Sequence, residues 1–424
     1  MMTIGFIVIF WYLDMNTKEP EIIFDPIIDF RQLPTAAPNA LDVSVGYQAG
    51  ADYPIGQPSD SDAPVSAAPE PTERPIDWNP ITVPPDGEVD AIWYNGEFEL
   101  PINGATGYAG VPLALRRLSD AGSELLHTLP AGKGFTILLE SGDWWYIKLD
   151  DESGGWVEHR YCFVNLQDII PSIVYNITNA YDSLYRSSGK IIPNVTHEEL
   201  YSAYSHNARF GRHEFIVPAF YSTAKKLYHA QQAALADGNT LIIYEVFRPY
   251  DVQQDIGRGL RALAEADPDV NAGLNSGPWS IGSFVATLSN HQRGVAIDVS
   301  LGQVYDSAVL VTGDYYYVKV TDYQEYIMQS PMHELSVAAV LFKNSIRLSH
   351  ISALRNTELS DSVTSETIKL LEYCMNAGLT PLASEWWHYD DLNGLQRSAA
   401  SGINGRYRID ENYSAAPRNN TRDG

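Results

Sequence analysis

Alternating apolar and polar positions along residues 295–300 predict a β-strand with one apolar and one polar face. Asp298 belongs to the polar face, whereas the opposite face carries the β-branched residues Val295, Ile297 and Val299. Gly294 stands directly before this strand and permits a sharp bend of the backbone. Such a bend would return His291 to the polar face, so the pattern places two candidate metal ligands close together.

Helix and strand periodicities recur throughout residues 171–412 and together indicate an α+β domain. The predicted helices cover 218–237, 251–266 and 365–377, and the predicted strands cover 241–247 and 314–320. Pro218 near the first turn and Gly238 at the end delimit the first helix. Arg248 directly follows the first strand, where a side chain can face a cleft, and a salt bridge at the rim is the alternative role.

Residues 90–170 contain short strand-like runs separated by turn residues, which predicts a small all-β barrel in front of the α+β domain. The predicted strands cover 134–139, 144–149 and 155–157. These runs contain the tryptophans Trp144, Trp145 and Trp156. The tryptophans form either the core and rim of the barrel or an exposed flat face for a peptide or a sugar ring.

The two ends of the chain differ in composition from the predicted domains. The apolar run within residues 1–32 is shorter than the about 20 residues that span a bilayer, and we interpret it as a signal or anchor remnant, with a buried strand as the alternative. Residues 33–89 are rich in Pro, Ala, Ser and Asp, which predicts an extended linker. Residues 413–424 are predicted to be a disordered tail.

The charge balance and the cysteine content exclude several classes of protein. The chain of 424 residues has 28 Lys and Arg against 53 Asp and Glu, a formal net charge of -25, so nucleic acid is not expected as a partner. Its two cysteines, Cys162 and Cys374, fall in different predicted domains. This excludes a disulfide framework and a zinc-thiolate site.

Two ligands hold a divalent ion poorly, and the segment Ser384–His388 supplies a third. His291, Asp298 and His388 would bind one zinc ion per chain and leave a fourth position for water, which is typical of a catalytic site. Glu385 is then free to act as the general base. A regular strand puts Glu385 and His388 on opposite faces, so a bulge or a bend is expected between them.

The motif S-x-H-x-x-G-x-A-x-D, which ends at Asp298, and the later E-W-W-H, which ends at His388, together resemble the signature of the D-alanyl-D-alanine metallopeptidases of the lysostaphin/D-Ala-D-Ala/sonic hedgehog (LAS) superfamily. The resemblance implies a zinc peptidase domain with a small antiparallel sheet flanked by helices. It also implies that Arg248 steadies the reacting carbonyl oxygen. Ser289 would hydrogen-bond the substrate terminus, and a loop-capping serine is the alternative.

Two further segments carry a family resemblance. Met328–Ser336 is similar to the segment that follows the first two ligands in the peptidases, which would make His333 and Glu334 pocket residues, but His333 is not counted as a metal ligand. Residues 126–132, the run D-W-W-Y-I-K-L and the run G-G-W-V-E resemble a bacterial SH3-like domain, a module often attached to cell-wall enzymes. This second resemblance implies binding to the cell wall and an extracytoplasmic location.

The substrate stays open between two possibilities. The Trp386-Trp387 pair is similar to the dipeptidases, which implies the free dipeptide D-Ala-D-Ala as substrate. The SH3-like domain and the apolar start suit a D,D-carboxypeptidase that acts on peptidoglycan stem peptides. A third hypothesis, from a different class, is a catalytically inactive wall-binding or sensing protein with a peptidase-like domain.

Overall fold

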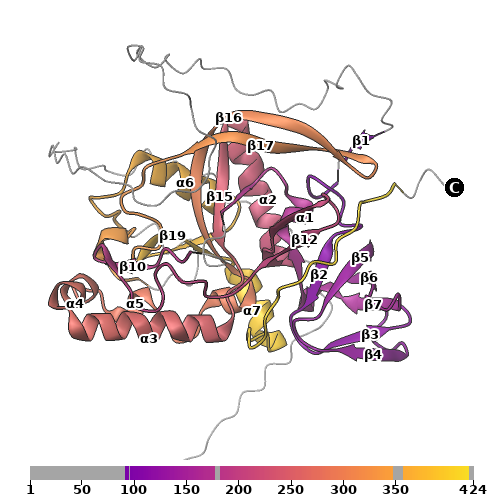
Figure 1. Cartoon of the computed structure of the whole chain (residues 1–424), viewed down its shortest axis with the longest axis horizontal. Helices are drawn as coiled ribbons and strands as arrows, with labels where there is room; N and C mark the ends of the chain where they lie inside the picture. The colour runs from indigo at the N-terminus through magenta and orange to yellow at the C-terminus, as the bar shows by residue number, and fades with distance from the viewer. Residues whose placement is uncertain (1–90, 95, 177–181, 347–356, 420–424) are drawn as a thin grey trace, which may run out of the picture. The chain divides into compact units, whose positions relative to one another are not determined.

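A computed structural model of the chain describes residues 91–94, 96–176, 182–346 and 357–419. All of these residues belong to one compact unit, which combines two large β-sheets with helices (Figure 1). The predicted α+β class is therefore confirmed. The N-terminal segment 1–32 and the linker 33–89 lie outside the described residues.

The seven-stranded sheet, sheet A, carries the candidate ligands Asp298 and His388 and is mostly antiparallel. Its strands are β1 (Ile92–Trp93), β17 (Tyr315–Glu325), β16 (Ala296–Thr312), β15 (Asn239–Glu245) and β9 (Val174–Tyr175), with β19 (Glu385–Asp390) paired to β16 and β18 (Thr380–Leu382) paired to β19. β16 and β17 form the long hairpin at the top of Figure 1. The strand predicted after Gly294 is confirmed as the start of β16.

The longer helices agree with the predicted periodicity except at one end. α3 (Tyr250–Ala266) and α6 (Ser365–Asn376) match the predicted helices within one residue at each end. α2 (Tyr221–Ala236) begins later than predicted, because Pro218–Phe220 forms strand β14 and pairs with a neighbouring strand. Gly238, at φ +72°, ends α2 in the left-handed conformation that glycine adopts readily.

Short elements connect these parts. They are α1 (Leu166–Ile169), α4 (Pro268–Leu274), α5 (Ile281–Phe284), α7 (Leu392–Ser401), the 3-10 helices η2 (His159–Tyr161), η4 (Asn290–Arg293) and η5 (Val337–Ala339), and the strands β10 (Arg186–Ser187), β11 (Lys190–Ile191), β12 (Tyr204–Asn207) and β13 (Arg212–Phe215). β10 pairs with β11, and β12 pairs with β13.

α2 packs on both β15 and α6 and so covers one face of sheet A.

The predicted barrel region forms most of the eight-stranded sheet, sheet B. Its order is β14 (Pro218–Phe220), β8 (Cys162–Asn165), β2 (Thr106–Ala109), β5 (Gly134–Ser141), β6 (Trp144–Lys148), β7 (Gly154–Glu158), β3 (Leu113–Arg116) and β4 (Leu125–Leu129). The three predicted strands are confirmed as β5, β6 and β7. The predicted closed barrel is wrong. Among the described residues, sheet B ends at β14 on one side and at β4 on the other, and these two strands do not pair with each other.

Aromatic contacts join sheet B to α2 and to the loop before β16. Trp145 is fully buried in the core, and its ring centroid lies 4.9 Å from that of Tyr221 on α2. The ring of Phe163 on β8 lies 5.6 Å from the ring of Phe247. The same Phe163 ring would be 3.0 Å from a Cβ at Gly294, so no larger residue fits there without a shift. Sheet B therefore supports the loop that carries His291.

Residues 413–419 of the predicted disordered tail 413–424 make hydrogen bonds to other parts of the chain, and residues 420–424 lie outside the described residues. The backbone N–H of Tyr413 donates to Oγ1 of Thr106 at 3.1 Å, and its carbonyl oxygen accepts from Oγ1 of Thr136 at 2.5 Å. The carbonyl oxygen of Pro417 then accepts from the backbone N–H of Asp314 at 3.2 Å, in the turn between β16 and β17. The segment therefore lies first against sheet B and then against this turn, where its backbone groups find partners.

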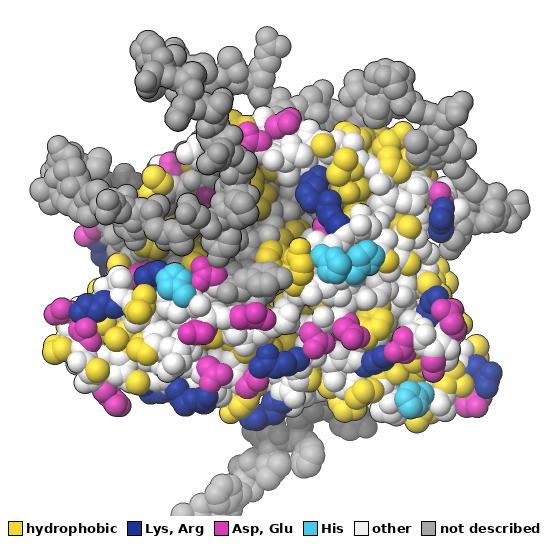
Figure 2. All heavy atoms as spheres, in the orientation of Figure 1, with side chains coloured by type: hydrophobic (Ala, Val, Ile, Leu, Met, Phe, Trp, Pro, Cys, Tyr) yellow, Lys and Arg dark blue, Asp and Glu magenta, His cyan; other side chains and the backbone are white. Residues whose placement is uncertain are grey.

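Cys162 and Cys374 are both buried and unpaired, as the sequence predicts. No helix within the described ranges is long and apolar enough to cross a membrane. Acidic and basic side chains are interspersed on the face shown in Figure 2, so charges of both signs share this surface.

We expect Phe163→Ala to lower the free energy of unfolding by about 3–5 kcal/mol, because it removes a buried ring between sheet B and the loop at Gly294. Urea unfolding measures this change. Leu139→Ala is the matched control, since Leu139 on the same sheet is 49% exposed and its loss should change stability by about 0.5 kcal/mol or less. Equal unfolding midpoints for the two variants would show that sheet B does not support the loop.

Candidate metal centre

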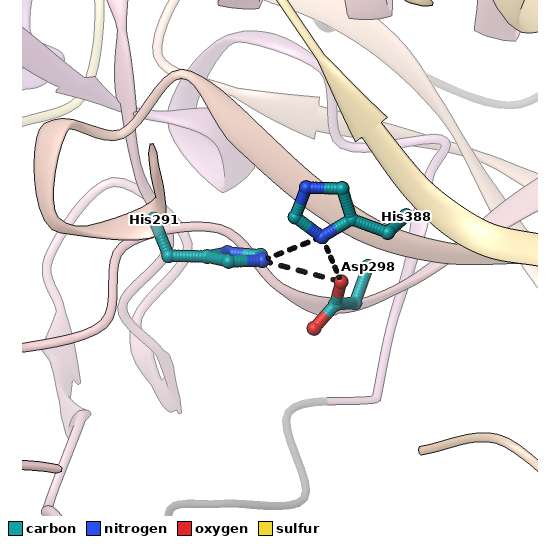
Figure 3. Close-up of side chains that lie close together, drawn as sticks. All are labelled: His291, Asp298 and His388. Carbon is teal, nitrogen blue, oxygen red and sulfur yellow. Dashed lines mark hydrogen bonds and ion pairs between the residues drawn. The ribbon is translucent and has the colours of Figure 1, made fainter. Parts of the chain in front are cut away.

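Three side chains that the sequence predicts as metal ligands point toward one another in a buried site (Figure 3). His291 and Asp298 are each 1% exposed and His388 is 8% exposed. Nε2 of His291 lies 3.1 Å from Nδ1 of His388. Oδ1 of Asp298 lies 3.2 Å from the first nitrogen and 3.1 Å from the second. Three potential ligand atoms thus form a nearly equilateral triangle.

Local structure explains why these side chains meet. Asp298 on β16 is paired with His388 on β19, which places the two residues side by side on sheet A. His291 lies in η4, which ends at Gly294 in the left-handed conformation, at φ +62°. The sharp bend expected at Gly294 is therefore confirmed, and it returns His291 to the strand that carries Asp298.

The outer nitrogen of each imidazole is already engaged. Nδ1 of His291 lies 2.8 Å from the carbonyl oxygen of Val246, and Nε2 of His388 lies 3.3 Å from Oδ1 of Asp390. A carbonyl and a carboxylate can only accept, so each outer nitrogen carries the proton in a neutral ring. Both inner nitrogens then present lone pairs to the same point, which is the arrangement of histidine ligands held by outer hydrogen bonds.

The donor set fits one divalent ion. In a tetrahedral site with bonds of about 2.0–2.1 Å, neighbouring ligand atoms are about 3.3 Å apart, close to the spacing of the triangle. Two imidazole nitrogens and one carboxylate oxygen suit zinc and leave further positions for water or substrate. His291, Asp298 and His388 are therefore the residues that would hold the ion.

The charges of the ligands are also suited to a metal. Burial tends to raise the pKa of Asp298, but His291 and the other histidines lower it well below its ordinary value, so the carboxylate is ionised. Burial lowers the pKa of His291 and favours its neutral form. The pKa of His388 is raised despite burial, chiefly by Asp390, so a metal must displace a proton from this ring.

Glu385 lies beside the three ligands because β19 is irregular. The pairing of β18 with β19 shifts register between Pro381 and Leu382, which confirms the bulge expected from the sequence. Oε2 of Glu385 lies 3.9 Å from Nδ1 of His388. Burial raises the pKa of Glu385 to about 8, although His388 opposes the shift. A carboxyl group with a pKa near neutrality can accept a proton and return it.

Arg248 also lies at the site, but its guanidinium is buried among partners. Nε donates to Oε2 of Glu245 at 2.7 Å, and Nη2 donates to Oδ2 of Asp298 at 3.2 Å. Nη1 donates to Oε1 of Gln253 at 2.6 Å. Arg248 therefore forms buried ion pairs with Glu245 and with the candidate ligand Asp298, rather than the salt bridge at the rim that was the alternative.

Ser289 takes the alternative role that the sequence left open. Its Oγ accepts a hydrogen bond from the backbone N–H of His291 at 3.3 Å and caps the start of η4. Glu334 accepts from the backbone N–H of Gly189 at 3.1 Å, so it anchors the β10–β11 turn. The role of Ser289 in substrate binding stays a prediction, and both residues have a clear structural function.

Glu245 and Tyr185 lie at the site but were not predicted from the sequence. His333 was predicted as a pocket residue, without a defined partner. Glu245 is a charged residue at the end of the buried strand β15, a position that could have drawn attention to it. The hydroxyl of Tyr185 lies 3.0 Å from Oε2 of Glu245. Nε2 of His333 lies 3.2 Å from Oδ2 of Asp298. Tyr185 carries no sequence signal, because it belongs to no periodic pattern.

Comparison with protein-family models and with curated proteins finds no match to this chain. The sequence motif and the distances between the three side chains are therefore the support for a metal site here. The geometry alone supports a buried histidine and aspartate site that could hold a metal ion.

We expect the purified chain to bind one zinc ion and His388→Ala to lose most of it, because only two ligands remain. Glu385→Ala should keep its zinc, since its carboxyl group is not one of the three converging ligands. His213→Ala on β13 is the control, because this exposed histidine lies outside the site. Elemental analysis after dialysis measures the occupancy. Undiminished zinc in His388→Ala, or equal loss in Glu385→Ala, would contradict the assignment.

Proposed function

We propose that this chain is a zinc-dependent D,D-peptidase that hydrolyses D-Ala-D-Ala bonds. The observation that carries the proposal is the buried carboxyl group of Glu385 beside the triangle of His291, Asp298 and His388. A metal-binding triad needs no such neighbour for a structural purpose, whereas hydrolysis needs a group that moves a proton. The motif resemblance to the D-alanyl-D-alanine metallopeptidases supports the same reaction.

Zinc bound at this site would polarise the peptide carbonyl group and lower the pKa of a water molecule. Glu385 would take a proton from the attacking water as the new C–O bond forms. It would then give this proton to the leaving amine nitrogen as the C–N bond breaks. The raised pKa of Glu385 supports this exchange, because it brings the affinity of the carboxyl group for a proton close to neutral pH.

Arg248 would act mainly by holding Asp298 and by setting the charge of the site. Among the described residues, Gln253 is the acceptor for Nη1 of Arg248, so this nitrogen keeps a second N–H. That N–H is the group that can meet the developing charge on a substrate oxygen, which is the role implied by the family resemblance.

We propose an extracytoplasmic wall peptide as the substrate, with sheet B as the wall-binding part. The resemblance of residues 90–170 to a bacterial SH3-like domain and the proline-rich composition of 33–89 support this location. A tether and a binding module favour an enzyme whose substrate is an immobile polymer. The Trp386-Trp387 pair instead favours the free dipeptide, so the two substrates must be compared directly.

The full chain should release D-alanine from D-Ala-D-Ala and from a pentapeptide stem that ends in D-Ala-D-Ala, and a chelator should abolish both reactions. Glu385→Gln should lower kcat by about 10²–10⁴ without loss of zinc, because it removes proton transfer and no ligand. Glu265→Gln is the matched control, since this exposed glutamate of α3 lies on the surface. Chromatography of the products and elemental analysis provide the two readouts.

Two outcomes would contradict parts of this proposal. Zinc binding without turnover of either substrate would support the alternative, a catalytically inactive wall-binding or sensing protein. A kcat/KM for the free dipeptide that exceeds that for the stem peptide by about 100-fold, or about 2.7 kcal/mol, would contradict the wall peptide as substrate.

A further inference from the structure

The two oxygens of Asp298 face different partners. Oδ1 belongs to the triangle with Nε2 of His291 and Nδ1 of His388, at 3.2 and 3.1 Å. Oδ2 points to the opposite side, where Nη2 of Arg248 and Nε2 of His333 each lie at 3.2 Å. A carboxylate can only accept, so both of these nitrogens donate to Oδ2. The hydroxyl of Tyr185 also donates to Oδ2, at the longer distance of 3.5 Å. Oδ1 of Asp298 therefore faces the candidate metal position, whereas Oδ2 faces hydrogen-bond donors.

His333 is held firmly in the position from which it reaches Asp298. Its side chain is fully buried and its ring stacks on Tyr185, with centroids 4.2 Å apart and planes 10° apart. Its backbone is left-handed at φ +59°, which is uncommon for a residue other than glycine. The N–H of Arg186 donates to the carbonyl oxygen of His333 at 3.1 Å. The stacked ring of Tyr185 and the hydrogen bond from Nε2 to Asp298 thus fix the orientation of the His333 ring.

A second metal ion would be an alternative use of this cluster. Glu245, Asp298 and His333 also bring three potential ligand atoms within 4.8 Å of one another. However, Arg248 already lies among them, with Nε 2.7 Å from Oε2 of Glu245 and Nη2 bonded to Oδ2 of Asp298. A guanidinium stays charged in proteins, so a divalent cation would meet a fixed positive charge here. The cluster is better suited to hold Asp298 than to bind a second ion.

We propose that His333 is a positioning residue that, together with Arg248, holds Oδ2 of Asp298 so that only Oδ1 is offered to the metal. The inference depends on the proposed metal centre but not on the proposed peptidase activity. Because Oδ2 is already held, the carboxylate has less rotational freedom to lose when Oδ1 binds the metal. Loss of such an outer partner typically lowers metal affinity about 10–100-fold.

The zinc affinity of the full chain, measured by competition with a chelator, tests this role. His333→Gly should weaken zinc binding about 10–100-fold, and its effect cannot come from backbone strain, because glycine tolerates the left-handed conformation. His333→Gln should recover affinity to within about threefold of the unchanged chain, since its amide nitrogen can donate from the same reach as Nε2. His213→Gln on β13 is the control and should leave the affinity unchanged.

The outcomes separate this inference from the metal centre itself. If His388→Ala loses zinc while His333→Gly keeps the full affinity, His333 does not position the ligand and the inference is overturned. The inference is also overturned if the unchanged chain binds two zinc ions and His333→Gly binds one, because His333 would then be a ligand. If neither variant changes zinc binding, the metal centre is wrong, whatever the role of His333. Thermal unfolding of each variant without zinc verifies that the chain is folded.

Discussion

The site depends on the burial of three electron-rich atoms that face one another. Nε2 of His291, Nδ1 of His388 and Oδ1 of Asp298 lie about 3 Å apart and are nearly inaccessible to solvent. In a neutral ring the single N–H lies on the outer nitrogen, where it donates to Val246 or Asp390. The inner nitrogens then have no proton with which to form a hydrogen bond to each other. Lone pairs at this distance need a cation between them, either a proton or a metal ion.

The fold meets this requirement by bringing separate segments to one strand. β16 lies between β15 and β19 near Asp298, so Glu245 is paired with Asp298 on one side and His388 on the other. The bend at Gly294 supplies His291, and Phe163 of sheet B packs against this bend. A strand in the middle of a sheet is a rigid support, which suits a site whose ligand atoms must keep fixed distances.

The sequence was most informative where the chemistry follows a local pattern. The strand after Gly294, the three candidate ligands and the irregular strand around Glu385 all follow from residue type and spacing. Tyr185 and Glu245 did not follow from the sequence, and His333 was expected only as a pocket residue without a partner. These residues lie far apart in the chain, and polar contacts between them have no period. The same limit applies to β14 and to residues 413–419, whose conformations are set by hydrogen bonds to segments that lie far away in the chain.

Anomalous diffraction at the zinc edge, from crystals of the chain grown with one equivalent of zinc, tests the central claim most directly. The account predicts one peak within bonding distance of Nε2 of His291, Nδ1 of His388 and Oδ1 of Asp298, at about 2.0–2.2 Å from each. Oδ2 of Asp298 should stay bonded to Arg248 and His333. A peak among Glu245, Asp298 and His333, or no peak at the triangle, would contradict it.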